Sequence, residues 1–207
     1  MPLVLNNIEI HLDSIALFKP LNLCVARGEI ATVMGPSGCG KSTLLAAICG
    51  TLEPGFNFSG TISLNNRLLN DVAMEERRVG ILFQDDLLFP HLDVYGNMAF
   101  GLPAKLNRRK KRERVRQSLA AAGLEGFENR DIATLSGGQK ARVSLLRSLL
   151  AEPEAILLDE PFSKLDKELR SAMREFVFNQ ITRLDIPALL VTHDRDDAPN
   201  GALLELN

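Results

Sequence analysis

A glycine-rich loop that ends in a lysine and a hydroxyl is the part of the sequence best suited to chemistry. It lies between an apolar run, residues 29–34, and a helix-like run, residues 43–49. The loop consists of Gly35, Pro36, Ser37, Gly38, Cys39, Gly40, Lys41 and Ser42, and is followed by Thr43. Glycines let a backbone wrap around an anion, and the start of a helix favours the same anion. We therefore predict a nucleotide-phosphate site in which Lys41 contacts the β- and γ-phosphates and Ser42 ligates magnesium.

Two carboxylates follow a second short apolar run. Residues 155–158 are Ala-Ile-Leu-Leu, and Asp159, Glu160 and Pro161 come next. This pattern is typical of a buried parallel strand that delivers acids at its C-terminal edge, where ligands bind. Asp159 is suited to hold magnesium through water, and Glu160 to orient and deprotonate an attacking water. We expect Pro161 to keep Glu160 extended. On its own, a strand that ends in two acids is structural about as often as it is functional. In a sequence that also contains a phosphate loop, the two acids are the expected second half of the nucleotide site.

A second helix start also has the chemistry of an anion site. Ser136, Gly137, Gly138 and Gln139 precede a helix-like run. Ser136 as N-cap and Gln139 three residues later predict a capping box. Capping does not require the two glycines, which instead allow a phosphate to approach the backbone. The sequence therefore contains two anion-binding helix starts.

Strands and helices alternate along the chain and predict how these groups are positioned. Apolar runs predict strands at 3–10, 21–25, 30–34, 60–64, 79–83, 155–158, 188–192 and 202–206. Helical patterns cover 107–122, 137–151 and 167–185. A polar, helical stretch from 85 to about 135 interrupts the order. The sequence therefore predicts an α/β fold with a helical insertion.

Composition limits the classes of protein that remain. With 207 residues, 45% of them apolar, the chain can build one substantial core. A net charge of −2 and a pI near 6.0 argue against a general nucleic-acid binder. The basic run at 108–116 is the local exception. A solvated helix face is its expected role, and contact with a polyanion or headgroup is the alternative.

The cysteines and the apolar runs indicate a soluble chain in a reducing compartment. Three cysteines are too few, and too unevenly spaced, for a disulfide framework or a zinc site. Residues 1–4 do not begin a basic segment followed by a long apolar one, and no apolar run approaches roughly 20 residues, so we expect neither a leader segment nor a membrane span in this sequence. We expect the isolated chain to be soluble, with any membrane role depending on a partner.

Taken together, these motifs resemble the ATP-binding cassette (ABC) family, whose nucleotide lies between the phosphate loop of one subunit and the Ser-Gly-Gly-Gln segment of another. The resemblance implies a P-loop NTPase (RecA-like) core with an N-terminal antiparallel β subdomain and an inserted helical subdomain. It implies one nucleotide-binding domain, 1–207, with an ATP-binding core at 1–84 and 136–207 and a helical signature subdomain at 85–135. It also implies ATP and Mg²⁺ as ligands, ATP hydrolysis coupled to transport, and a homodimer. The segment acting in trans comprises Ser136, Gly137, Gly138 and Gln139.

The resemblance extends to three further positions. Gln84 looks like the glutamine that touches magnesium and the attacking water, and it would join Ser42 and Asp159 at the metal. His193 looks like the histidine that contacts the γ-phosphate, and it would join Glu160 and Gln84 in catalysis. In isolation, Gln84 and His193 would be plain turn and loop residues. The segment Ser163-Lys164-Leu165-Asp166 looks like the loop that crosses the dimer interface.

The helical lobe resembles that of bacterial importers for anions, metals, polyamines and thiamine-like compounds. The matching residues are 87–94, Asn97 and 100–102. This implies a membrane permease that docks near Asp85–Leu102 on exposed Leu88, Phe89 and Leu92. It also implies a separate solute-binding protein, no nucleic-acid partner, and a place at the cytoplasmic face of the bacterial inner membrane.

Three other functions compete with import. The chain could serve an ABC exporter, act as an ABC-type ATPase uncoupled from transport, or be a nucleotide-switched binding module without turnover. Tandem cassettes or a long coiled-coil insertion, usual in the uncoupled ATPases, are missing from the sequence. Glu160 argues against the switch module, because such cassettes commonly lack that carboxylate.

Two departures from the family pattern shape further expectations. Near Leu12, where the family usually has an aromatic ring that stacks on adenine, the sequence reads His11-Leu12-Asp13. We therefore expect weak discrimination between ATP and GTP, unless another aromatic side chain covers the base. The sequence after His193 is short, so we expect no C-terminal regulatory domain of the kind found in larger relatives.

Overall fold

The computed structural model describes residues 2–163, 165–199 and 201–206. Their contacts divide the chain into two compact units. The first comprises Met1–Ile81, Glu154–Glu160 and Phe178–Asn207, and the second comprises Leu82–Pro153 and Pro161–Val177. The helical lobe expected at 85–135 lies within the second unit, which also includes residues 136–153 and 161–177.

One sheet of the first unit is built from buried, mostly parallel strands. Its strand order is β10-β4-β9-β8-β7. The strands are β4 (Ile30–Met34), β7 (Val79–Leu82), β8 (Ala155–Asp159), β9 (Ala188–Val191) and β10 (Leu203–Glu205). β9 pairs in parallel with both β4 and β8, and β10 pairs in parallel with β4. Side chains along β4 and β9 are buried on both faces, which explains their continuous apolar sequences.

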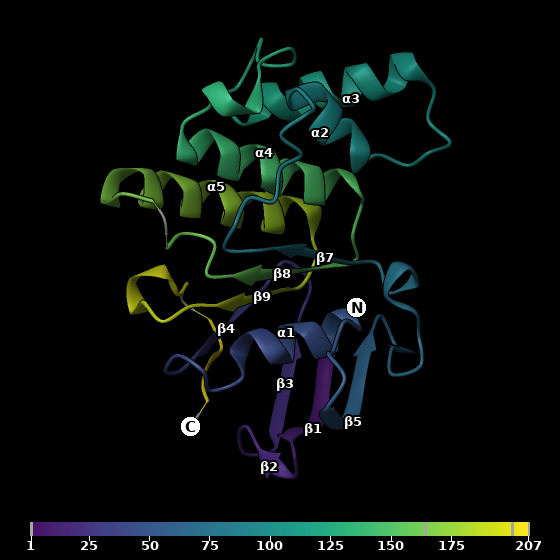
Figure 1. Cartoon of the computed structure of the whole chain (residues 1–207), viewed down its shortest axis with the longest axis vertical. Helices are drawn as coiled ribbons and strands as arrows, with labels where there is room; N and C mark the ends of the chain where they lie inside the picture. The colour runs from purple at the N-terminus through teal and green to yellow at the C-terminus, as the bar shows by residue number, and fades with distance from the viewer. Residues whose placement is uncertain (1, 164, 200, 207) are drawn as a thin grey trace. The chain divides into compact units, whose positions relative to one another are not determined.

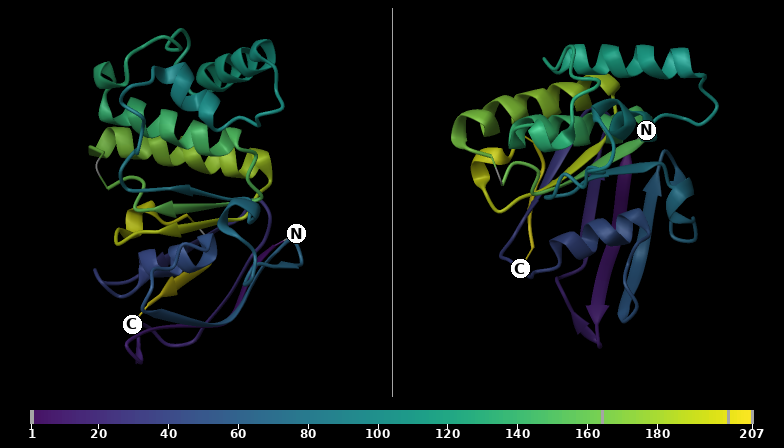
Figure 2. Two further views of the ribbon diagram at one scale, coloured as in Figure 1. Left: turned by 45° about the vertical axis from the view of Figure 1, so that its right-hand side comes forward. Right: turned by 45° about the horizontal axis from the view of Figure 1, so that its top comes forward.

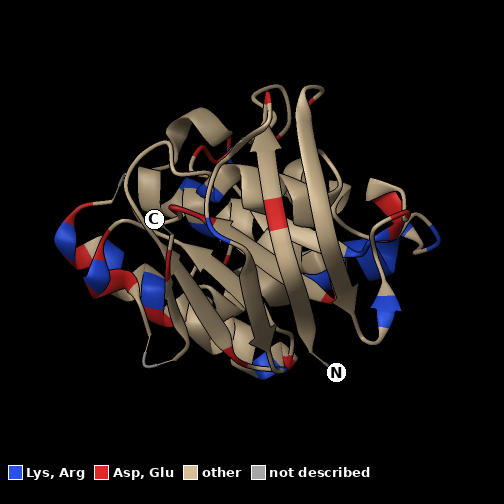
Figure 3. Cartoon of the chain, turned by 90° about the horizontal axis from the view of Figure 1, so that it is seen from below, with Lys and Arg blue, Asp and Glu red and all other residues tan. Residues whose placement is uncertain are grey.

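The second sheet of this unit is antiparallel. Its long strand β1 (Leu3–Leu12) pairs with β2 (Ile15–Ala16), β3 (Leu21–Val25) and β5 (Phe56–Leu64), and β6 (Arg67–Leu68) extends β5. Glu9 is the one Asp, Glu, Lys or Arg residue of β1, β3 and β5, and the long strands seen in Figure 3 are accordingly almost entirely tan. Alternate residues of β1 and β5, such as Leu5 opposite Ile62, are buried.

Helix α1 (Lys41–Cys49) lies between the two sheets, as both views in Figure 2 show. Its Leu44, Leu45 and Ile48 are fully buried, in one apolar core with residues of β1, β4, β5, β8 and β9. The phosphate loop thus leads from a buried strand into a buried helix, so its backbone is held at both ends.

The second unit is helical around its own core (Figure 1). It contains α2 (Val94–Phe100), α3 (Arg108–Ala121), α4 (Gly137–Leu150) and the first part of α5 (Lys167–Leu184). α2 packs against α3 and α4, with Val94, Met98, Val115 and Val143 fully buried. Short 3-10 turns occur at Met74–Glu76, Ile132–Thr134 and Arg195–Asp197.

The α/β class and most of the expected elements are confirmed, but three differences have physical reasons. β5 begins at Phe56, earlier than expected, because its polar residues alternate with Phe56 and Phe58 and form the solvent face. α2 was expected only as part of a polar stretch, yet Val94, Asn97 and Met98 are buried in it. β2 and β6 have two residues each, too short to leave a pattern. Among the described residues, no helix has the length and apolar character needed to cross a bilayer.

Candidate nucleotide-binding site

The phosphate loop has a backbone that only glycine tolerates at key points. A Cβ atom at Gly35 would lie 2.6 Å from Cys39 Sγ and 2.8 Å from the Leu206 carbonyl oxygen. Gly40, the N-cap of α1, has φ of 93° in the left-handed region. Both glycines are therefore needed for the tight path that leads into the helix start.

Lys41 is held inside this loop. Its Nζ donates hydrogen bonds of 2.8 Å to the carbonyl oxygens of Gly35 and Pro36, and the residue is only 7% exposed. The side chain follows the loop back to its beginning, so the ammonium group lies among the loop's own carbonyls. An anion that enters the loop would meet this cation together with the amide groups at the start of α1.

Ser42 and Asp159 form the contact between the loop and β8. Ser42 Oγ donates to Asp159 Oδ1 at 3.4 Å. Burial raises the pKa of Asp159, the Ser42 hydrogen bond lowers it, Glu160 raises it and Lys41 lowers it, in decreasing order of size. A hydroxyl and a carboxylate side by side are hard oxygen donors of the kind that Mg²⁺ prefers. Among the described residues, no group of three or more Asp, Glu, His or Cys side chains is arranged to hold a metal ion by itself. Magnesium here would need further ligands, which phosphate and water can supply.

Glu160 does not have the extended backbone that Pro161 led us to expect. Its φ is 45°, in the left-handed region, which is unusual for a residue with a side chain. The Glu160 N–H donates to the Val191 carbonyl oxygen at 2.9 Å, so β9 holds the backbone where β8 has ended. This contact outweighs the preference imposed by proline, and a strained backbone of this kind often marks a functional site.

His193 reaches Glu160 from the end of the neighbouring strand. His193 Nδ1 lies 3.1 Å from Glu160 Oε2, and the His193 side chain is 60% exposed. The turn that carries it is held by Thr192, whose hydroxyl accepts from the Asp194 N–H and donates to buried Asp197. The first unit therefore brings together the phosphate loop, Asp159, Glu160 and His193.

The other predicted residues belong to the second unit. Gln84 lies just after β7, and its Nε2 donates to Ser163 Oγ at 3.3 Å. Asp166 accepts from the Leu169 N–H at 3.0 Å and so caps the start of α5. Lys164 lies outside the described residues. Gln84 thus contacts the same loop that the resemblance assigns to the dimer interface.

The predicted capping box at α4 is confirmed. Ser136 Oγ accepts from the Gln139 N–H at 3.3 Å, and Gln139 Oε1 accepts from the Ser136 N–H at 3.0 Å. A Cβ atom at Gly138 would lie 3.1 Å from Leu169, whereas one at Gly137 would meet nothing within 4 Å. Gly138 is therefore explained by packing, and Gly137 leaves the helix start open to an approaching group.

Two features near the site have no local signal in the sequence. Arg77 is 6% exposed and donates to the carbonyl oxygens of Ala47 and Ile48 at 2.9 Å each, at the last turn of α1. A cation there adds hydrogen bonds to carbonyls of the last turn and complements the helix dipole, although burial lowers the arginine's pKa. Leu12 pairs directly with Phe56 across β1 and β5, so an aromatic ring does lie beside Leu12.

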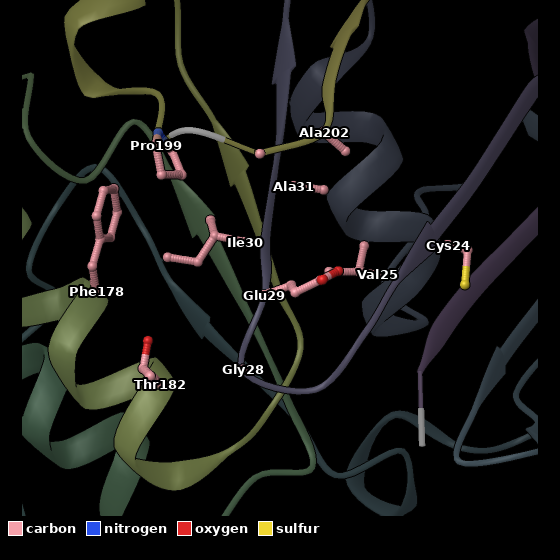
Figure 4. A pocket seen from close by; sticks show the side chains of 11 residues that line it. Cys24, Val25, Gly28, Glu29, Ile30, Ala31, Phe178, Thr182, Pro199 and Ala202 are labelled. Carbon is pink, nitrogen blue, oxygen red and sulfur yellow. The ribbon is translucent and has the colours of Figure 1, made fainter.

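A separate cavity of about 320 Å³ lies elsewhere in the first unit (Figure 4). Ile30 at the start of β4 points toward the side of Phe178 and Thr182 of α5, and Glu29, Val25 and Pro199 are among the other lining residues. None of the residues predicted to bind nucleotide lines it. The phosphate loop and this cavity are therefore distinct features.

Comparisons with known proteins agree with the geometry. A family model described as "ABC transporter" matches residues 18–163. The uncharacterized ABC transporter ATP-binding protein YnjD of Escherichia coli (strain K12) is 46% identical over 197 residues, which cover 95% of this chain and 91% of YnjD. The spermidine/putrescine import ATP-binding protein PotA of Mesoplasma florum is 40% identical over 95% of this chain. That alignment covers 55% of PotA, so the chain spans about half of its length.

A solved structure shows the same fold. It is the dimeric, post-hydrolysis state of the ATP-binding cassette MJ0796 bound to ADP and Pi. The TM-score is 0.81 at 30% sequence identity, and the match covers 99% of this chain and 94% of that one. The two-sheet unit and the helical unit thus have a counterpart in a cassette of known structure.

Proposed function

Because this chain belongs to the ABC transporter family as an ATP-binding, ATP-hydrolysing subunit, we propose that it energises a solute importer. Import is supported by PotA, whose name describes an import protein and which aligns with 95% of this chain. The resemblance of residues 87–102 to importer lobes points the same way. The solute itself would be selected by other components, namely the permease and a separate solute-binding protein.

The contact from Ser42 through Asp159 and Glu160 to His193 is the observation that carries the proposed catalytic roles. Lys41 binds the β- and γ-phosphates, and Ser42 with Asp159 offers oxygen ligands to Mg²⁺. Magnesium, when bound, neutralises charge on the phosphates. Glu160 orients the attacking water and accepts its proton, and His193, 3.1 Å away, holds the Glu160 carboxylate and contacts the γ-phosphate. Gln84 contributes to the metal and to the water.

We further assign the trans half of the site to the start of α4. The related cassette MJ0796 was solved as a dimer. A twofold pairing would place the open helix start at Ser136, Gly137, Gly138 and Gln139 against the nucleotide of the partner. Gly137 supports this role, because no atom of the described residues lies close enough to explain the absence of a side chain there. In this scheme 1–84 and 136–207 form the ATP-binding core, and 85–135 forms the helical signature subdomain.

The permease would dock on Asp85–Leu102, but through different side chains from those first expected. Leu88, Phe89 and Leu92 are partly buried, whereas Leu87 is 56% and Phe100 is 70% exposed. The Phe89 ring packs against the Phe100 ring at 4.9 Å between centroids. Phe89 therefore packs against the exposed Phe100 ring. Leu87 and Phe100 are the exposed apolar side chains that a membrane subunit's helix could contact.

This surface is hydrogen-bonded directly to α4. The Asp86 carbonyl oxygen accepts from Ser144 Oγ at 2.7 Å and from Arg147 at 3.3 Å, and the Leu87 carbonyl oxygen accepts from Arg147 at 2.9 Å. Ser144 and Arg147 belong to α4, which begins at the proposed trans site. A displacement of α4 during the ATP cycle would therefore move the docking surface with it. Such a subunit would work at the cytoplasmic face of the bacterial inner membrane.

Paired variants test the docking surface. Leu87→Ser with Phe100→Ser should leave soluble ATPase activity intact but prevent recovery of the chain in the membrane fraction with a permease co-expressed from a neighbouring gene. The control changes two apolar residues of the first unit that are also more than half exposed, Leu68→Ser with Met74→Ser, and this variant should be recovered in the membrane fraction with the permease as the wild type is. Equal recovery of both variants would refute docking at this surface.

The direction of transport needs a reconstituted complex. In vesicles that contain the chain and its permease, a solute-binding protein loaded with solute should stimulate ATP hydrolysis if the system imports. Stimulation by solute added on the ATPase side, with no response to the binding protein, would indicate export instead.

A further inference from the structure

The first two turns of α3 carry the densest positive charge in the chain. We call Arg108, Arg109, Lys110, Lys111 and Arg112 the α3 basic cluster. All are exposed except Lys111, which is partly buried. The buried residues of α3 are Val115 and Leu119, both in the second half of the helix. The first half is therefore polar on every side and gains little from packing.

The local electrostatics work against a helix at this place. Five cations occupy the helix start, where the positive end of the dipole lies, and no acidic residue is in the first turn. Like charges also face each other four residues apart at Arg108 and Arg112, Lys110 and Arg114, and Arg112 and Arg116. Asn107 caps the helix by accepting from the Lys110 N–H at 3.0 Å, but a cap does not reduce this repulsion.

Acidic neighbours balance the later cations of the helix but not the earlier ones. Arg114 pairs with Glu152, Arg116 lies 3.5 Å from Glu128, and Arg112 lies over the Tyr95 ring. Within the part of the chain that the structure describes, Arg108, Arg109, Lys110 and Lys111 form no ion pair. The countercharge for the helix start is thus not supplied from within the described chain.

Charge is also separated between this helix and the rest of the chain. Residues 108–116 hold seven of the 24 Lys and Arg residues and one of the 26 Asp and Glu residues. The remaining residues, with 17 basic against 25 acidic side chains, carry a net charge of −8. An anionic surface would therefore attract α3 and repel most of the remaining chain, which orients the contact.

We propose that the α3 basic cluster contacts the anionic headgroups of a phospholipid bilayer. Clusters of four to eight Lys and Arg on a helix beside a membrane are typical of such contacts. The inference rests on the assignment of the chain to a membrane transporter, and it adds a direct lipid contact to the one through the permease. A nucleic acid fits less well, because residues 108–116 contain no aromatic side chain for base stacking and the positive charge does not extend beyond one helix.

Permease-free vesicles test this contact without assuming import. The α3 variant replaces four cations of the cluster with glutamine: Arg108→Gln, Arg109→Gln, Lys110→Gln and Arg112→Gln. The matched control removes four exposed cations from other elements: Lys19→Gln, Arg67→Gln, Lys167→Gln and Arg183→Gln. Both variants change the net charge by the same amount. Neither variant changes a residue predicted to bind nucleotide, so both should keep the ATPase activity of the soluble chain.

Binding is measured by sedimentation with phosphatidylcholine vesicles that contain about 30 mol% phosphatidylglycerol, at about 0.1 M salt. Each basic residue near such a surface contributes roughly a fivefold factor to partitioning. The α3 variant should therefore bind at least about tenfold more weakly than the wild type, while the control stays close to the wild type. Pure phosphatidylcholine vesicles and high salt should abolish the difference.

Three outcomes would overturn the proposal. One is equal binding of the α3 variant and the control. Another is tighter, α3-dependent binding to a single-stranded RNA than to the vesicles at the same salt. The third is a fall in the melting temperature of the α3 variant larger than loss of the Arg112–Tyr95 contact explains, because removal of mutual repulsion should otherwise leave the helix as stable or more stable. In each case the variants' ATPase activity still reports separately on the proposed function.

Discussion

Replacement of Lys41 by methionine should weaken ATP binding by about 30- to 150-fold. In the structure the ammonium group already donates to the Gly35 and Pro36 carbonyl oxygens at 2.8 Å each. Binding of a triphosphate therefore exchanges two hydrogen bonds and does not create two new ones. Methionine keeps the apolar stem of the side chain and removes only the charge and the donors.

The magnitude follows from the strength of the bonds exchanged. Hydrogen bonds that involve a charged group contribute roughly 1.5–3 kcal/mol, with neutral carbonyl acceptors at the lower end and charged phosphate at the upper end. A difference of about 1–1.5 kcal/mol for each of two bonds gives about 2–3 kcal/mol, which corresponds to the stated range. Counting only the two new hydrogen bonds to phosphate, without subtracting the two carbonyl bonds that are given up, would overestimate the loss of ATP affinity.

Isothermal titration with ATP and Mg²⁺ measures the effect. Lys105→Met, at an exposed lysine of the second unit, is the matched control and should bind ATP as the wild type does. Circular dichroism before each titration establishes that both variants are folded. A change of less than about threefold in Lys41→Met, or an equal loss in the control, would refute the assignment of this loop as the phosphate site.

Three further variants test other parts of the site. Burial raises the pKa of Asp159 in the folded chain above its ordinary value of 3.8. The folded chain therefore loses stability as the pH rises from that value through the raised pKa, where Asp159 ionises. Asp159→Asn should therefore raise the melting temperature of the nucleotide-free chain at neutral pH, by roughly 1–4 °C, and remove the magnesium dependence of ATP binding; a lower melting temperature contradicts this. Phe56→Ala should weaken ATP binding by about 1 kcal/mol if its ring stacks on the base in place of Leu12, whereas unchanged affinity in titration excludes that role. Arg77→Met should lower the melting temperature by roughly 3–10 °C, because it removes the hydrogen-bond donors to buried carbonyls of α1. A change in melting temperature of less than about one degree by calorimetry would show that these hydrogen bonds are not needed for stability.

The local structure that sequence reasoning predicted correctly is encoded in contiguous residues. The capping box depends on Ser136 and Gln139, three positions apart, and it forms as predicted. The acids at the end of β8 follow a run of four buried apolar residues, which is sufficient to indicate a buried strand. The capping box lies within one turn of the chain, so spacing alone determines its geometry, whereas the contacts of Asp159 with Ser42 and of Glu160 with His193 join distant parts of the chain.

The features that sequence reasoning missed depend on residues far apart in the chain. Arg77 caps the end of α1 from about thirty positions away, and Phe56 reaches Leu12 only through the register of β1 and β5. The backbone of Glu160 is set by a hydrogen bond to Val191 on another strand, which overrides the local effect of proline. The partial burial of Phe89 likewise follows from its packing on Phe100.

The most direct test of the account asks whether two copies of the chain share the nucleotide. Glu160→Gln should retain ATP binding, lose about a hundredfold or more in turnover, and form a dimer on size-exclusion chromatography only with ATP and magnesium. Gly137→Glu in the same background should stay folded, since the added side chain meets no neighbour, but should block the dimer by repelling the phosphate. A Glu160→Gln chain that remains monomeric with ATP and magnesium at high concentration, or a dimer that tolerates Gly137→Glu, would contradict the shared site.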